Sequence, residues 1–97
     1  MDVISAREAI AELIVGHEIA IESEIAVVNA LEPYFDAWQT ATRDTVTTEL
    51  TRRVRQRQGS QSSIRQWTKE LEAFRVALEA LNQMAQTTGD QHQSSEA

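Results

Sequence analysis

The chain of 97 residues contains no cysteine, a single proline and only three glycines. The absence of cysteine excludes disulfide bonds and thiolate metal sites, and it leaves the redox compartment open. Proline and glycine are the residues that most often interrupt regular backbone structure. Because the chain has so few of them, the sequence favours a small number of long helices over many short strands.

Long apolar runs are also missing. A membrane-spanning helix needs about 20 consecutive, predominantly apolar residues, whereas the nearest candidate, residues 10–31, contains four glutamates and a histidine. The first five residues, Met-Asp-Val-Ile-Ser, lack the basic start and the cleavage site of a secretory signal peptide. We therefore expect a soluble protein, neither secreted nor membrane-bound, that resides in the cytoplasm or within a virion-like particle.

Catalytic and cofactor-binding signatures are absent as well. The two histidines are His17 and His92, and the residues three positions before them are Ile14 and Gly89. The Glu-x-x-His pairs of di-iron helical bundles are therefore missing, and so are the His-Glu-x-x-His motif and the glycine-rich loops that bind nucleotides. We predict that the protein is not an enzyme and uses no metal, cofactor or small-molecule substrate.

The most regular feature that the sequence does contain is a series of apolar residues separated by alternating steps of three and four. The series consists of Ile64, Trp67, Leu71, Phe74, Leu78, Leu81 and Ala85. This spacing is the a/d pattern of coiled coils, held for about three heptads. It predicts a helix whose narrow apolar stripe packs against another helix, and the first six residues form the candidate helix interface.

The first third of the chain is predicted to form a helix over residues 5–31. Ser5 and Glu8 have the spacing of a capping box, in which each side chain binds a backbone N–H group at the start of a helix. An apolar stripe follows at steps of three and four: Ile10, Ile14, His17, Ile21, Ile25, Val28 and Leu31. A polar residue on such a stripe is expected to form a hydrogen bond across the interface and fix its register; a pH-sensitive contact is the alternative for His17.

Further apolar residues of this helix, Val15, Ile19 and Val27, lie outside the stripe. The apolar surface is therefore wide enough to meet two neighbours. Residues 18–28 are also rich in β-branched side chains, which leaves a strand as the alternative for that segment.

Two breaks are predicted farther along the chain, at Glu32–Pro33 and at Gly59–Ser63. Proline disfavours helical geometry in the residue before it and suits the first position of a new helix, so a second helix is predicted over residues 33–58. Glycine commonly ends helices and serine begins them, so a third helix is predicted over residues 64–86. The polar residues 87–97 show no periodicity and are predicted to form a disordered tail.

The middle helix depends most on packing, because six threonines between residues 40 and 51 weaken its intrinsic helicity. Its predicted inner face consists of Tyr34, Phe35, Trp38, Ala41, Val46, Leu50 and Val54. A strand over residues 45–54 is the alternative.

Charge is distributed unevenly within the net charge of −6. Residues 1–32 hold seven acidic residues against one basic residue, whereas residues 33–58 hold three against five. The positive excess comes from four arginines: Arg52, Arg53, Arg55 and Arg57. At the end of a helix they complement the helix dipole; alternatively they contact nucleic-acid phosphates or an acidic partner.

The segment that follows these arginines, residues 57–67, resembles the turn and recognition helix of helix-turn-helix proteins. It contains a glycine followed by three serines within four residues and then Ile64, although Arg65 stands where that motif has an apolar residue. The resemblance implies DNA as a ligand.

These patterns predict an all-α protein of two or three long helices, arranged as an antiparallel hairpin or bundle with coiled-coil-like packing and completed by oligomerisation. Residues 1–86 are expected to form a single helical domain. The predicted function is that of a structural or assembly protein in a multi-subunit particle, such as a virion, with copies of itself or other structural subunits as partners. A nucleic-acid-binding protein and a small regulatory adaptor are the alternatives.

Overall fold

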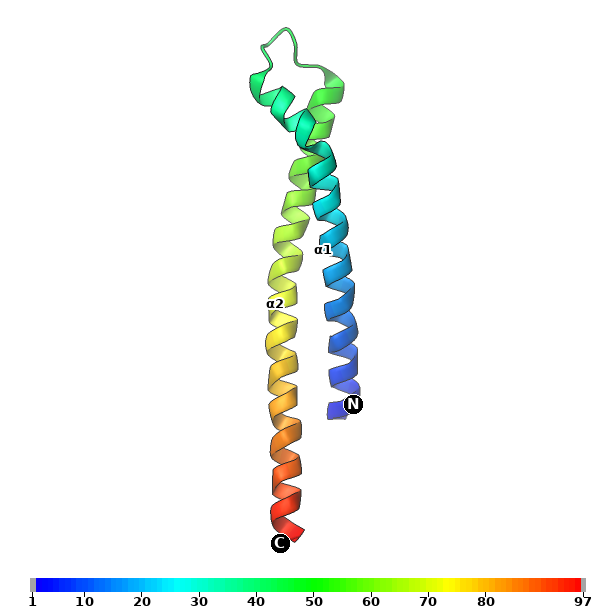
Figure 1. The fold of residues 1–97 in the computed structure, drawn as a ribbon, viewed down its shortest axis with the longest axis vertical. Coiled ribbons are helices and arrows are strands. Elements are labelled where there is room, and N and C mark those ends of the chain that lie inside the picture. Colours follow the sequence, from blue (N-terminus) through cyan, green and yellow to red (C-terminus); the bar gives the residue numbers. More distant parts are fainter. Residues whose placement is uncertain (1, 97) are drawn as a thin grey trace. The chain divides into compact units, whose positions relative to one another are not determined.

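The computed structural model describes the backbone of residues 2–96 and the side chains of residues 2–87. Its two helices are α1 (Val3–Thr40) and α2 (Thr48–Glu96), which are joined by a loop and packed antiparallel (Figure 1). The prediction of an all-α protein is confirmed, with two helices rather than three. The described backbone contains no strand, so the strand alternatives for residues 18–28 and 45–54 are wrong.

Contacts between the helices divide the chain into two compact units. Unit 1 consists of Met1–Glu18 and Lys69–Ala97, and unit 2 consists of Ile19–Thr68. Each unit therefore pairs a segment of α1 with a segment of α2, and each is described by itself below. A single domain over residues 1–86 stays a prediction.

Helix α1 begins two residues earlier than the sequence predicts. The carboxylate Oδ1 of Asp2 accepts a hydrogen bond from the backbone N–H of Ser5 at 2.7 Å, which makes Asp2 the N-cap residue. This N–H, followed by the Ser5 hydroxyl, lowers the pKa of the Asp2 carboxyl. The predicted capping box is wrong because Ser5 lies inside the first turn of the helix.

Pro33 does not end α1, so the break predicted at Glu32–Pro33 is wrong. A proline inside a helix removes one backbone hydrogen bond and costs about 3 kcal/mol. Leu31 is buried just before the proline and Phe35 is half-buried just after it, so packing on both sides carries the helix through. Figure 1 shows α1 changing direction in this region, which is the bend expected at an internal proline.

The turn between the helices occupies residues 41–47, inside the segment predicted as the middle helix. The Thr45 hydroxyl accepts a hydrogen bond from the N–H of Thr42 at 2.8 Å and donates one to the carbonyl oxygen of Thr42 at 3.0 Å. The Thr47 hydroxyl then accepts the N–H of Leu50 at 3.1 Å and caps α2. Threonine side chains that bind the local backbone compete with helix formation, and here they end one helix and begin the next.

The second predicted break, at Gly59–Ser63, lies inside α2 and is also wrong. No glycine in the described part of the chain adopts a positive φ, so Gly59 does not form a left-handed cap. Ser60 is buried on the face that packs, and the buried Val54 and Leu71 flank the segment. Tertiary packing on both sides overrides the low helix propensity of glycine and serine.

Helix α2 also continues past residue 86, where the sequence predicts its end, to Glu96. The backbone of residues 87–96 is helical, which differs from the disordered tail that the sequence predicts, and the side chains beyond Thr87 lie outside the described residues. Within the described residues, neither helix has a stretch long and apolar enough to cross a membrane.

The face of α1 that packs repeats every three or four residues, as the sequence predicts, but its members differ. The residues that are buried or half-buried in heptad register are Val3, Arg7, Ile10, Ile14, His17, Ile21, Glu24, Val28, Leu31 and Phe35. Glu24 occupies the position expected for Ile25, which is 43% exposed. In the predicted inner face of the middle helix, Tyr34, Trp38 and Val46 are exposed as well.

The resulting core is thin. Only four hydrophobic side chains are buried among the described residues, namely Ile14, Leu31, Val54 and Leu71, and no large side chain is fully buried. Two packed helices enclose only one line of side chains between them, so most apolar residues keep one side in contact with solvent.

Candidate assembly interface

The seven residues of the α2 stripe all turn away from solvent. Leu71 is buried and the other six, Ile64, Trp67, Phe74, Leu78, Leu81 and Ala85, are half-buried. In unit 1 the Phe74 ring meets the edge of the His17 ring from α1, with 5.0 Å between their centroids and 88° between their planes. The helix that covers this stripe in unit 1 is therefore α1 of the same chain, and use of the stripe between copies stays a prediction.

His17 links the two helices of unit 1 through both of its ring nitrogens. Nε2 lies 2.8 Å from Oε2 of Glu70, and Nδ1 lies 3.1 Å from the carbonyl oxygen of Leu13. A carbonyl oxygen and an ionised carboxylate only accept hydrogen bonds, so both nitrogens donate when Glu70 is ionised. The histidine forms the cross-helix hydrogen bond that its place on the stripe predicts.

The four clustered arginines do not converge on one site. Arg52 and Arg53 both bind Glu49, with Nη2–Oε2 and Nε–Oε1 distances of 2.6 and 2.8 Å. Hydrogen bonds from Arg52 and then Arg53 lower the pKa of the Glu49 carboxyl. The Arg53 guanidinium also lies 5.5 Å from the centre of the Tyr34 ring.

Arg57 is part of the packing of unit 2. Its side chain is 12% exposed, and its Nε lies 3.0 Å from Oε2 of Glu32 on α1. The guanidinium carbon lies 3.9 Å from the centre of the Phe35 ring, within cation–π range. A guanidinium held between a carboxylate and an aromatic ring has little freedom to reach a phosphate.

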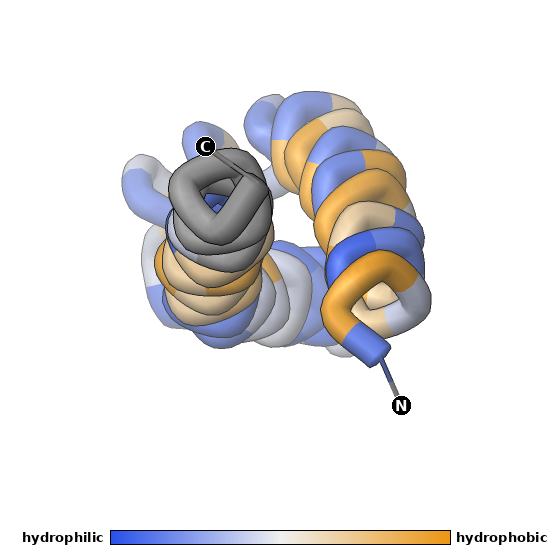
Figure 2. Tube along the Cα trace, turned by 90° about the horizontal axis from the view of Figure 1, so that it is seen from below, coloured by the Kyte–Doolittle hydropathy of each residue, from blue (hydrophilic) through white to orange (hydrophobic). Residues whose placement is uncertain are grey.

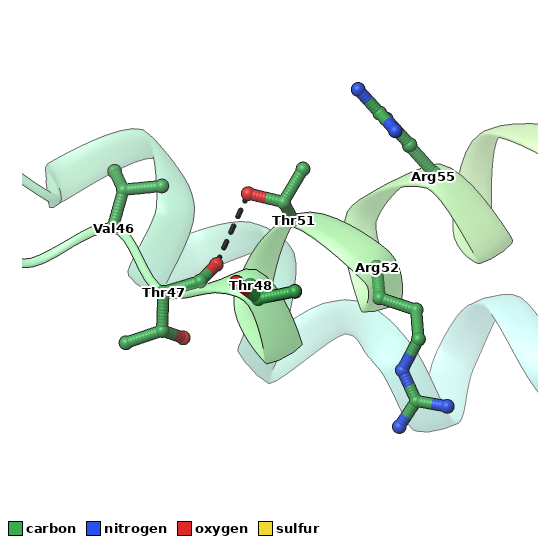
Figure 3. Close-up of a pocket in the computed structure, with 6 residues that line it drawn as sticks. All are labelled: Val46, Thr47, Thr48, Thr51, Arg52 and Arg55. Carbon is green, nitrogen blue, oxygen red and sulfur yellow. Dashed lines mark hydrogen bonds between the residues drawn. The ribbon is translucent and has the colours of Figure 1, made fainter.

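Arg52 and Arg55 line a shallow pocket at the start of α2 together with Val46, Thr47, Thr48 and Thr51. Figure 3 shows that the two arginine side chains point in different directions, and that the Thr51 hydroxyl is bonded to the backbone of Thr47. The arrangement lacks the convergent donors of a phosphate-binding site.

The segment that resembles a helix-turn-helix contains no turn, because residues 57–67 lie within the uninterrupted α2. A recognition helix needs a preceding helix at a steep angle to it. The structural basis of that resemblance is therefore absent.

Large apolar side chains that remain exposed are the most unusual feature of the surface. Among the residues whose side chains are described there are ten: Ile4, Leu13, Val15, Ile19, Ile25, Tyr34 and Trp38 of α1, Val46 of the loop, and Val76 and Met84 of α2. Figure 2 shows hydrophobic residues recurring on more than one side of α1. The apolar residues found outside the predicted stripe, such as Val15 and Ile19, were the sequence signal for this surface, whereas Val76 and Met84 were missed because they lie off the α2 stripe.

Comparisons with protein-family models, with curated proteins and with solved structures find no match to this chain. The described residues contain no group of three or more metal-ligating side chains. The contacts and the exposed surface of the two helices are therefore the basis on which a function is inferred.

Proposed function

We propose that the protein is a non-enzymatic assembly component whose helices associate, through apolar surface left free by the antiparallel pair, with copies of itself or with other structural subunits of a particle such as a virion. The observation that carries this proposal is the contrast, within residues 2–87, between ten exposed large apolar side chains and four buried hydrophobic ones. Contiguous exposed apolar surface on a soluble protein commonly marks an interaction site.

The energetic argument concerns the small core. Full burial of a large apolar side chain contributes about 1.5–3 kcal/mol, and domains of this size often add buried area by forming oligomers. Two of these exposed residues, Leu13 and Met84, are 46% and 54% exposed. Association that covers them adds the apolar burial that two helices alone do not provide.

The four arginines of residues 52–57 give little support to nucleic-acid binding as the function. Of its four arginines, three already contact carboxylates and two of those also contact aromatic rings. Phosphate contact would therefore depend mainly on Arg55 and on the outer side of Arg52.

Light scattering on the purified chain, alone and with duplex DNA, tests the proposal. We expect a mass of at least twice 10.9 kDa for the chain alone, with no mass gain on adding DNA. A mass of 10.9 kDa with intact helicity, or a mass gain that depends on DNA and disappears in Arg52→Gln/Arg55→Gln, would contradict it.

A further inference from the structure

We propose that unit 1 binds a second copy of the chain through the uncharged part of one side of its helix pair, here called the neutral flank. The neutral flank consists of Ala6, Ala9, Leu13 and Gly16 of α1 and Ala73, Ala77, Ala80 and Met84 of α2. The proposal rests on the proposed function and specifies which surface of unit 1 mediates it and what covers that surface.

The two sides of unit 1 are identified by contacts between the helices. On one side a shared groove is lined by Ile4, Arg7, Glu8, Ala11, Leu78 and Asn82. The same side carries the ion pair between Glu18 and Arg75, whose Oε1 and Nη2 atoms lie 3.7 Å apart. In an antiparallel pair, residues that directly follow a residue of the packed stripe lie on one side of the stripe, and residues that directly precede one lie on the other.

The neutral flank is the part of this second side that lies between Asp2 and Glu70, and none of its eight members is charged. Leu13 and Met84 are 46% and 54% exposed, and Ala6 and Ala77 are half-buried beside the packed stripe. The other four members are exposed. Asp2 and Glu70 stand at the two ends of the flank, where Asp2 accepts the Ser5 N–H and Glu70 binds His17.

Small side chains on this flank permit close approach of another helix. A Cβ atom added to Gly16 would meet nothing within 4 Å inside the chain, so the fold of the single chain does not require a glycine there. Glycine in a helix interior lowers stability relative to alanine, and it is useful where another backbone approaches closely. Alanine, which occupies most of the other positions of the neutral flank, likewise leaves the surface flat.

A second copy is the occupant that matches this surface in charge. Each copy carries a net charge of −6, and the charges of α1 in unit 1 lie on the packed stripe, the groove side and the outer face. Two neutral flanks can meet about a twofold axis without opposing like charges, whereas a nucleic acid or a strongly basic partner would find no opposite charge there.

The area available also suits a pair of copies. Residues 3–18 of α1 form about 24 Å of helix, and two helices side by side are about 20 Å wide. The flank therefore offers roughly 500 Å² per copy, or roughly 1,000 Å² in total, which reaches the lower limit for a specific interface. Unit 2 has uncharged residues at the matching heptad positions, including Ala20, Ser23, Val27, Ala30 and Ser63, so the same type of contact is available there.

Paired charge substitutions on the two sides of unit 1 test the proposal. Leu13→Glu/Ala80→Glu places two carboxylates on the neutral flank, and we expect it to weaken self-association about 100-fold or more, because unpaired charges would be buried. Val15→Glu/Val76→Glu adds the same charge at exposed positions off the flank and should leave the association constant within about threefold of the wild type. Sedimentation measures association, and circular dichroism verifies that each variant is helical.

Disulfide trapping gives a second readout that does not depend on the stability of the glutamate variants. The chain has no cysteine, so Ala9→Cys/Ala80→Cys should form covalent dimers on oxidation, and Val15→Cys/Val76→Cys should form few. Equal trapping by both variants, or equal weakening by both glutamate pairs, would overturn the proposal while leaving self-assembly intact. A wild-type chain that is monomeric at every concentration, or that gains mass only with a different protein, would overturn the proposed function as well.

Discussion

At the scale of single residues, Arg57 is the clearest example of a side chain whose role changes between sequence and structure. Its place in a run of four arginines suggests a contact with an external anion. In the fold it occupies an a-type position of α2, where it binds Glu32 and stacks on Phe35. Sequence composition shows that the arginine is there, but only the pairing of α1 with α2 determines what it touches.

Substitution of Arg57 tests this internal role. We expect Arg57→Met to lower the free energy of unfolding by about 2 kcal/mol, because Glu32 loses its partner in a partly buried site. Arg52→Met is the matched control: Arg52 is 65% exposed, and its loss should change stability by less than about 0.5 kcal/mol. Urea unfolding of both variants measures the difference, and equal effects would place Arg57 on the solvated surface.

Other residue-level expectations depend on rules that hold locally, and several were correct. The alternating spacing of Ile64, Trp67 and Leu71 places them on one face of any α-helix, so their protection from solvent could be predicted. Ile25 could not be placed in the same way, because Glu24 and Ile25 compete for one position and the register of the partner helix decides which one faces inward.

At the scale of helices, the sequence predicts helical structure correctly but places the breaks wrongly. Pro33 and Gly59 are the strongest local signals for a break, yet both lie inside helices. The true loop, residues 41–47, has neither proline nor glycine and is set by threonine hydroxyls that bind the backbone. Local propensities of about 1–3 kcal/mol are outweighed when buried residues on both sides of the residue hold the helix together.

Gly59→Ala distinguishes an internal glycine from a helix cap. An added Cβ would meet nothing within 4 Å, and the glycine has no positive φ. We therefore expect the substitution to raise the free energy of unfolding by about 0.5–1 kcal/mol. Thermal unfolding followed by circular dichroism measures it, and a destabilised variant would indicate that α2 is interrupted there as the sequence first suggested.

At the scale of the whole molecule, the account depends on how little apolar surface the chain buries by itself. Each unit pairs one segment of α1 with one segment of α2 and therefore has one layer of packing, which leaves large apolar side chains such as Leu13 and Met84 exposed. The sequence indicates this outcome through apolar residues beyond one stripe, but it does not show which side of the pair stays free. The Glu18–Arg75 ion pair and the groove beside it identify the charged side of the helix pair. The free side is the opposite one, and only the structure shows which it is.

The central claim is that copies of the chain cover this surface and so stabilise one another. It is tested most directly by the midpoint of thermal unfolding at two protein concentrations about 100-fold apart. If folding and association are coupled, the midpoint should rise by about 5–10 °C at the higher concentration. The same midpoint at both concentrations, with a fully helical signal before unfolding, would contradict the account.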